Sequence, residues 1–191
     1  MNIGLLLSGC GVYDGAEIQE AIFSMLAIEE IGATVVPISI DQEQNHVINH
    51  LTGEVTGEKR NMMVEAARIT RGNVSEINSI DISTLDAVVI PGGFGSAKNF
   101  TTWAFDGPAG TINDAVKKFI LAMHGAKKPI LALCVSPVVV AKAFENSGVS
   151  TTLTIGSSTS PSPYTISDFE AGIVATGAKT EQANLGEVAL D

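Results

Sequence analysis

The sequence predicts an α/β fold, a three-layer α/β/α sandwich with a mainly parallel central sheet. Short runs of consecutive apolar residues, as expected of strands buried on both faces, alternate with segments whose apolar residues recur at helical spacing. The chain has 191 residues, of which 45% are hydrophobic, so it can bury one sizeable core. We therefore expect a single domain over residues 1–191.

Five segments are predicted to be strands because each is a short aliphatic run. They are residues 2–8, 34–40, 85–90, 130–133 and 151–155. In folds of this class, ligands bind beyond the carboxyl ends of the strands. The segments that follow the first, third and fourth of these strands are therefore the places to look for a functional site.

Five further segments are predicted to be helices, since their apolar residues repeat every three or four positions. They are residues 17–31, 60–71, 113–124, 137–146 and 165–175. The Ser/Thr/Pro-rich residues 157–163 are predicted to form a loop.

The charge balance excludes several classes of partner. Acidic residues number 21 and basic residues 11, which gives a net charge of −10, and no basic stripe is present. A nucleic acid or an anionic membrane is therefore not an expected partner. The first residues lack the positive n-region of a signal peptide, and no stretch approaches the roughly 20 apolar residues of a membrane span. We expect a cytoplasmic protein.

The strongest local indication of chemistry is Cys134, which follows one predicted strand and precedes a helix that starts at Pro137. In a nucleophile elbow, strand and helix pass so closely that the residues two before and two after the nucleophile must be small. Here they are Ala132 and Ser136. A cysteine at a helix N-terminus meets the positive end of the dipole, which favours the thiolate. The alternative is that Cys134 is a buried hydrophobic residue at a strand end.

Two glycine-rich segments follow other strands. Within residues 89–96, adjacent glycines let backbone N–H groups approach a ligand and supply one donor of an oxyanion hole, with the N–H of Val135 as the natural second donor. The alternative is a tight turn that binds nothing. Residues 9–15 nearly match a dinucleotide-binding pattern, with Asp41 as the ribose-binding acid, but their last glycine lies one residue too far along.

Glu17 and Glu20 open the helix that follows this segment and share one side of it. Acids in a first helical turn usually compensate the helix dipole. Alternatively, one of them points into the cleft, where burial keeps it protonated and able to hydrogen-bond a thiolate.

The histidines do not predict a catalytic or metal site. His46 and His50 fall in a stretch placed away from the strand ends, and His124 ends a helix, where it suits the dipole. Cysteine, aspartate and glutamate do not flank them at zinc-like spacing, so no metal is expected.

Several separated motifs together resemble the enhancing-lycopene-biosynthesis (ElbB) family, also described as sigma cross-reacting protein. They include Ser-Gly-Cys-Gly-Val-Tyr-Asp-Gly-Ala-Glu-Ile-Gln-Glu at residues 8–20 and Pro-Gly-Gly-Phe-Gly-Ser-Ala-Lys-Asn at residues 91–99. Residues 47–54, 60–61 and 65–69 also match. That family belongs to the superfamily of the parkinsonism-associated deglycase and the PfpI-type proteases, whose fold is flavodoxin-like and class I glutamine amidotransferase-like.

The resemblance implies a site. Cys134 falls on the elbow cysteine of the superfamily, within the pattern Cys-Val-Ser-Pro, and Glu20, rather than Glu17, falls on the helix glutamate that contacts this cysteine. Gly93 and Val135 fall on the backbone donors that face it. Cys10 also belongs to the family pattern and is expected to have a structural or redox-accessory role.

The resemblance also implies a function, namely a glyoxalase III-type lyase that converts glyoxal or methylglyoxal to 2-hydroxy acids without a cofactor, with a link to isoprenoid biosynthesis. Some branches of the superfamily have a histidine at the position of Val135, and others have one at the position of Gly156. Because this chain has neither histidine, protease-like activity is not expected. The alternative is a non-enzymatic redox-sensing or regulatory protein with an oxidisable cysteine. A small aldehyde substrate and a homodimer are expected. Because relatives continue past Asp191, a final strand and helix are expected to be lacking.

Overall fold

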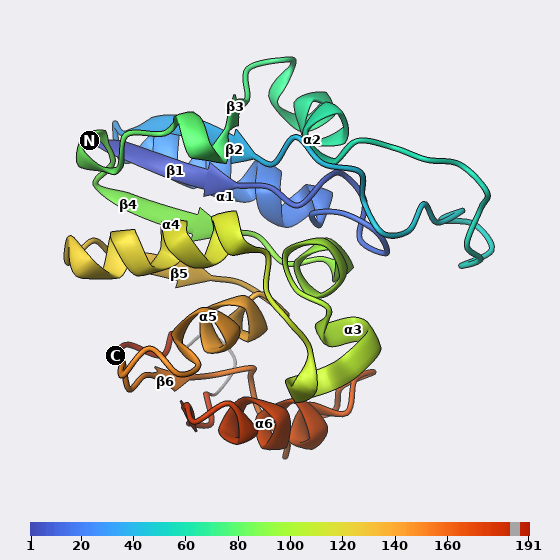
Figure 1. Ribbon diagram of the computed structural model, residues 1–191, viewed down its shortest axis with the longest axis vertical. Coiled ribbons are helices and arrows are strands. Elements are labelled where there is room, and N and C mark those ends of the chain that lie inside the picture. The colour runs from blue at the N-terminus through green and yellow to red at the C-terminus, as the bar shows by residue number, and fades with distance from the viewer. Residues whose placement is uncertain (184–187) are drawn as a thin grey trace.

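The computed structural model describes residues 1–183 and 188–191 and has the predicted α/β architecture (Figure 1). Its central sheet contains five parallel strands in the order β3-β2-β1-β4-β5. These strands are β1 (Asn2–Leu6), β2 (Thr34–Ser39), β3 (Ser75–Glu76), β4 (Ala87–Ile90) and β5 (Ile130–Ala132).

Helices cover both faces of this sheet. The α-helices are α1 (Ile18–Glu30), α2 (Met62–Thr70), α3 (Trp103–Asp106), α4 (Asp114–Gly125), α5 (Pro137–Phe144) and α6 (Ile166–Ala175). Short 3-10 helices span Ile77–Ser79, Ile82–Thr84 and Gly107–Ala109, and a π-helix spans Ser96–Phe100. Among the described residues, none of the helices is long and apolar enough to cross a membrane.

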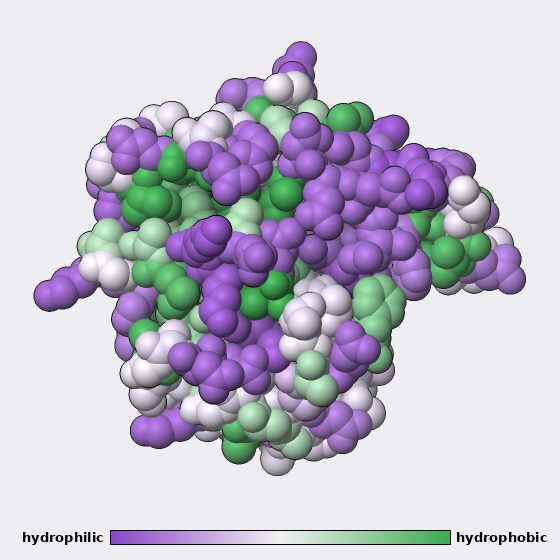
Figure 2. Space-filling model, viewed as in Figure 1, coloured by the Kyte–Doolittle hydropathy of each residue, from purple (hydrophilic) through white to green (hydrophobic). Residues whose placement is uncertain are grey.

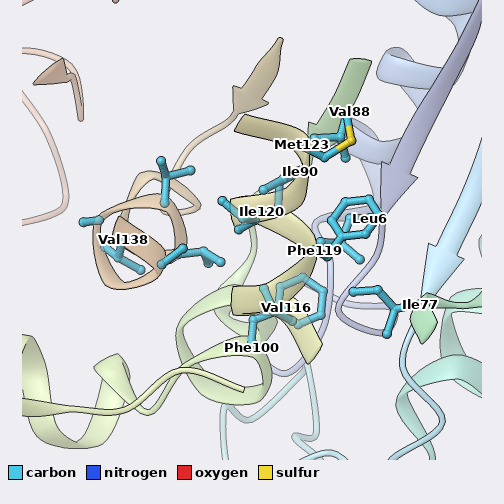
Figure 3. Close-up of a cluster of buried hydrophobic side chains, with 14 of the residues drawn as sticks. Leu6, Ile77, Val88, Ile90, Phe100, Val116, Phe119, Ile120, Met123 and Val138 are labelled. Atoms are coloured by element: carbon cyan, nitrogen blue, oxygen red, sulfur yellow. The ribbon is translucent and has the colours of Figure 1, made fainter. Parts of the chain in front are cut away.

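Two neighbouring residues of β1 show the three layers directly, because successive side chains of a strand point to opposite faces. Leu5 packs with Ile28 of α1 and Ile69 of α2 in one buried cluster. Leu6 packs in another cluster with residues of α4 and α5, among them Phe119 and Val138 (Figure 3). The sheet therefore lies between α1 and α2 on one side and α4 and α5 on the other.

The region after α5 differs from the prediction. The expected fifth strand of the parallel sheet is present only as β6 (Thr152–Leu153), which pairs with β7 (Lys179–Thr180) in a separate two-stranded sheet. Both strands are two residues long and incompletely buried, so their pairing depends on tertiary contacts rather than on an apolar run. Helix α6 lies beyond the β5 edge of the main sheet (Figure 1).

Helix α1 forms where predicted, but its apolar residues do not all face the core. Ala21 and Ile28 are buried, whereas Ile22 and Leu26 are 43% and 49% exposed. The helix packs on β1, β2 and α2, which leaves its other flank uncovered. On the face shown in Figure 2, hydrophilic residues predominate and smaller apolar patches lie between them.

The strand order creates a crevice between β1 and β4. After β1 the chain proceeds to β2 and β3, and it then returns to place β4 on the other side of β1. The connections that leave the carboxyl ends of β1 and β4 therefore lead to helices on opposite faces of the sheet, α1 and α4, and such a reversal point is the usual ligand site in these sheets. These two connections touch through their backbones, since Phe94 N donates to Val12 O at 2.7 Å and Gly95 N donates to Gly15 O at 2.9 Å.

Two buried serines attach the β4 connection to the start of α5. The Ser136 hydroxyl donates to Pro91 O at 2.7 Å and lies 2.8 Å from the Ser96 hydroxyl, which is itself 3.3 Å from Pro91 O. Ser136 lies two residues after Cys134. These bonds therefore fix the position of the connection after β4 relative to the turn that carries the cysteine.

We predict that Ser136→Ala lowers the free energy of unfolding by about 1–3 kcal/mol, because the substitution leaves buried polar groups without a partner. Chemical denaturation measures this change. The matched control is Ser167→Ala in α6, an exposed serine, for which we expect a change within about 0.5 kcal/mol. An equal change in the free energy of unfolding for both variants would show that the Ser136 hydrogen bonds do not stabilise this region.

Candidate functional site

Cys134 occupies the sharp turn between β5 and α5 in a left-handed conformation, with φ of +53°. Such a conformation costs a non-glycine residue on the order of 1–3 kcal/mol and persists only where the surroundings impose it. The side chain is exposed. The structure therefore contradicts the alternative that Cys134 is a buried hydrophobic residue, and the turn has the geometry of a nucleophile elbow.

Glu20 reaches this turn from the first turn of α1. Its Oε2 accepts a hydrogen bond from Gly92 N at 2.6 Å, and its carboxyl group hydrogen-bonds the Cys134 side chain. Glu17 has a different position, as the N-cap of α1, where its Oε2 accepts from Glu20 N at 2.7 Å. Of the two glutamates considered from sequence, the structure brings Glu20 to the cysteine and places Glu17 at the N-cap, where α1 begins.

The glycine pair after β4 lets the backbone approach both side chains. A Cβ on Gly92 would lie 2.8 Å from Glu20 Oε2 and 3.0 Å from Cys134 Sγ, so any larger residue would displace one of them. Gly93 has φ of +91°, a backbone conformation in which a residue with a side chain would be strained. The N–H groups of Gly93 and Val135 both donate hydrogen bonds to the cysteine. All four site residues predicted from sequence therefore meet at one point.

Opposing effects act on the acidity of the cysteine. Burial of the sulfur by neighbouring atoms raises the pKa of Cys134 even though part of the side chain is exposed, and the Glu20 carboxylate raises it further. The hydrogen bonds from Gly93 and Val135 lower this pKa but do not outweigh burial and repulsion. The sequence-based expectation that the helix dipole makes Cys134 an unusually acidic thiol is therefore wrong.

The pKa of Glu20 is also raised. Burial is the largest cause, the charge of Glu17 adds to it, and the hydrogen bonds from Gly92 and Cys134 oppose it. The two groups are adjacent, and the charge of the Glu20 carboxylate opposes ionisation of the Cys134 thiol. A state with one proton between Glu20 and Cys134 avoids two neighbouring negative charges.

The segment at residues 9–15 does not form a nucleotide cradle. The helix N-terminus, where a pyrophosphate would bind, is capped by the Glu17 carboxylate, which accepts from Glu20 N. Asp41, considered as a ribose-binding acid, accepts a hydrogen bond from Asn61 Nδ2 at 2.6 Å. Nucleotide binding is therefore not a function that we propose.

His50 lies elsewhere than the sequence predicted. The sequence placed it away from the strand ends, but it contacts the connection after β1. Its Nε2 accepts a hydrogen bond from Tyr13 N at 3.2 Å and lies 3.8 Å from the buried Asp14 carboxylate. Residues so far apart in sequence gave no local signal of this contact. His124 is in the last turn of α4, as predicted. Among the described residues, no three His, Cys, Asp or Glu side chains are grouped to hold a metal ion.

Cys10 lies on the side of the sheet covered by α1 and α2, where it packs against the buried apolar cluster. It is half-buried, and burial followed by the charge of Glu65 raises the pKa of its thiol. These surroundings agree with the structural role that was one of the two expected for this residue.

A pocket of about 120 Å³ opens beside the cysteine. Residues from the connections after β1 and β4, from the elbow, and from the segments after β6 and around the start of α6 line it, namely Val12, Gly93, Phe94, Cys134, Val135, Ile155, Tyr164, Ile166 and Phe169. The last four are functional-site candidates that sequence reasoning missed. Ile155 ends the fifth predicted strand, Tyr164 follows the predicted loop, and Ile166 and Phe169 belong to the last predicted helix. Only tertiary structure brings these residues to Cys134.

Sequence comparison finds relatives among curated proteins, although no protein-family model matches the chain. ES1 protein homolog, mitochondrial, of Rattus norvegicus is 43% identical over 145 residues, or 75% of this chain and 54% of that protein. Human glutamine amidotransferase-like class 1 domain-containing protein 3, mitochondrial, is 42% identical over 142 residues, 74% and 53% of the two chains. The chain thus spans about half the length of the curated relatives it matches.

Solved structures support the same assignment. An isoprenoid biosynthesis protein with an amidotransferase-like domain from Ehrlichia chaffeensis is 34% identical, with a TM-score of 0.84 over 96% of this chain and 79% of that one. A ThiJ/PfpI domain protein from Brachyspira murdochii, 15% identical with a TM-score of 0.56 over 95% and 79% of the two chains, shares the fold. The predicted fold class is confirmed. The chain belongs to the family of amidotransferase-like proteins represented by the Ehrlichia chaffeensis structure, and it is similar to the ES1 proteins over about half of their length.

Proposed function

We propose that the chain is a cysteine-dependent enzyme of glyoxalase type, which converts a small dicarbonyl such as glyoxal or methylglyoxal to its 2-hydroxy acid. The observation that carries the proposal is the exposed Cys134, held in a left-handed turn with a carboxyl group and two backbone N–H donors at its sulfur. Nucleophile, proton carrier and oxyanion donors are the parts that addition to a carbonyl requires.

The first step is addition to the aldehyde. The Cys134 thiolate forms a bond to the aldehyde carbon, and the electron pair of the carbonyl π bond moves to its oxygen. The N–H groups of Gly93 and Val135 stabilise that oxygen, and Glu20 donates the proton that completes a hemithioacetal. Glu20 receives this proton from the Cys134 thiol as the sulfur attacks, and its raised pKa favours the protonated carboxyl group.

The remaining steps move hydrogen within the substrate. The Glu20 carboxylate removes the proton from the former aldehyde carbon, whose electron pair forms a double bond to the neighbouring carbon while the oxygen of that carbon takes up a proton, which gives an enediol. Glu20 then returns its proton to the neighbouring carbon, and the hydroxyl group of the first carbon releases its proton, which replaces the one taken up by the other oxygen. The first carbon is thereby oxidised to a thioester and the second reduced to an alcohol, so no external oxidant or reductant is needed. Water then hydrolyses the thioester, which releases the 2-hydroxy acid and regenerates the thiol.

The finer family assignment belongs to the same proposal. The motifs at residues 8–20 and 91–99 support a place in the ElbB group. The description of the Ehrlichia chaffeensis relative as an isoprenoid biosynthesis protein supports a link to that metabolism.

We predict that Cys134→Ala abolishes the conversion of methylglyoxal to lactate, because no covalent adduct can form. Lactate produced per mole of protein measures this. Cys10→Ala is the matched control, since this half-buried thiol packs in the apolar cluster, and its activity should remain within a few-fold of wild type. Lactate formation by Cys134→Ala at the wild-type rate would disprove the assignment.

We predict that Glu20→Gln lowers turnover by about 10²–10⁴-fold, the usual contribution of a positioned acid or base. The amide oxygen can still accept from Gly92 N, so the loop geometry is retained. Since the carboxylate raises the pKa of Cys134, its removal should lower this pKa, and the thiolate should form at lower pH. Ultraviolet absorbance of the thiolate across a pH titration, read as the difference from a Cys134→Ser background, measures the shift.

Glu17→Gln is the control, because Glu17 caps α1 through a single hydrogen bond from Glu20 N. It should alter turnover and the pKa of Cys134 much less. A Cys134 pKa that rises or stays unchanged in Glu20→Gln would contradict the proposed pairing.

A second candidate function is redox sensing without catalysis, in which Cys134 is oxidised to a sulfinate. The groups around Cys134 favour this second function as well. A protonated Glu20 and the N–H groups of Gly93 and Val135 can hydrogen-bond the oxygens of a sulfinate.

We predict that mild peroxide adds the mass of two oxygen atoms to wild type and not to Cys134→Ser, as measured by intact mass spectrometry. If the untreated protein converts dicarbonyls and peroxide then modifies Cys134, the result supports the enzyme. The modification in a protein that converts no dicarbonyl supports the sensor. Equal oxidation of wild type and Cys134→Ser contradicts both assignments of Cys134.

A further inference from the structure

The pocket beside Cys134 is placed to receive the substituent of the substrate rather than its reacting carbon. Its lining includes Cys134 and both residues whose N–H groups face the sulfur, Gly93 and Val135. A group that occupies the pocket is therefore attached within one or two bonds of the carbon that the sulfur attacks. Glu20 does not line the pocket.

The chemistry of the walls is apolar. Val12, Phe94, Ile155, Ile166 and Phe169 present only hydrocarbon, and none of the described lining residues is charged. A carboxylate, phosphate or polyhydroxylated chain placed here would lose its hydration and would find few partners besides the Tyr164 hydroxyl and the N–H groups beside the sulfur. The net charge of −10 further disfavours an anionic substrate.

The size of the pocket limits the substituent. Its volume is about 120 Å³, whereas an apolar protein cavity of about 150 Å³ holds one benzene molecule. The space therefore suits a group of three to five carbons. The hydrogen of glyoxal or the methyl group of methylglyoxal would leave most of the apolar wall without contact.

We propose that this pocket binds a branched alkyl substituent, and that the preferred substrates are 2-oxoaldehydes carrying such a group, with isobutylglyoxal as the test compound. The identity of the reaction rests on the function proposed above, whereas the preference for an apolar substituent rests on the pocket alone. Elements distant in sequence build this specificity, since Ile166 and Phe169 come from α6 and Val12 from the connection after β1.

The expected preference follows from burial. Each buried methylene contributes about fourfold to binding, so the three additional carbons of isobutylglyoxal should raise kcat/KM about 50-fold over methylglyoxal if all are buried. Ile166→Thr, which places a hydroxyl in the wall, and Phe169→Leu, which keeps it apolar but removes the ring, should each reduce this ratio. Val174→Ala is the matched control on the same helix, because Val174 is 53% exposed and does not line the pocket; its ratio should remain that of wild type.

A second measurement needs no turnover. Chloroacetone and its isobutyl analogue both alkylate a thiol at the chloromethyl carbon, where a C–S bond forms and chloride leaves, and both carry the substituent on the adjacent carbonyl. The rate of Cys134 alkylation, located by peptide mass spectrometry because Cys10 is a second thiol, is compared with the rate for free glutathione. We expect the isobutyl compound to react with Cys134 at least tenfold faster than chloroacetone after this correction, and Ile166→Thr to reduce the difference.

The outcomes separate the two proposals. Conversion of dicarbonyls with no preference for the isobutyl substituent in either measurement would overturn this inference and leave the proposed function standing. Selective alkylation by the isobutyl compound in a protein that converts no dicarbonyl would overturn the proposed function and support the apolar pocket. A preference that Val174→Ala removes as strongly as Ile166→Thr would also overturn the inference.

Discussion

The close approach of the Gly92 backbone to Cys134 and Glu20 is the contact on which the site depends. Gly92 N donates to Glu20 Oε2 at 2.6 Å, and a Cβ at this position would lie 3.0 Å from the sulfur. The Gly92 backbone thus contacts both side chains directly. Ser136 and Ser96 hold the same loop through Pro91 O, so the geometry around the sulfur is fixed by buried hydrogen bonds.

The electrostatics of this contact differ from those of a simple activated thiol. Burial raises the pKa values of both Cys134 and Glu20, and a neighbouring carboxylate adds to each shift, that of Glu20 for the cysteine and that of Glu17 for Glu20. The backbone N–H groups of the connections oppose both shifts. One proton shared by two groups can be given to an oxygen and recovered from a carbon. Such a pair suits the proposed reaction, in which a proton moves twice.

Sequence alone predicted the parts of the site that are local. The elbow at Cys134 follows from a strand, small flanking residues and Pro137, and the meeting of three connections follows from a parallel sheet. Sequence did not predict the separate pairing of β6 with β7, because pairing of two-residue strands is set by tertiary contacts. For the same reason the pocket wall formed by Tyr164 and Phe169 was missed. The acidity of Cys134 was misjudged, since burial cannot be read from a helix N-terminus.

The proposed function depends on a covalent bond between Cys134 and the dicarbonyl during turnover. Acid quenching of the wild-type protein while it converts methylglyoxal, followed by peptide mass spectrometry, detects such a bond. We expect a peptide containing Cys134 that has gained the mass of the substrate or of its thioester and that loses this mass once the substrate is consumed. Turnover of methylglyoxal with Cys134 unmodified at every time point would show that the reaction does not pass through this cysteine.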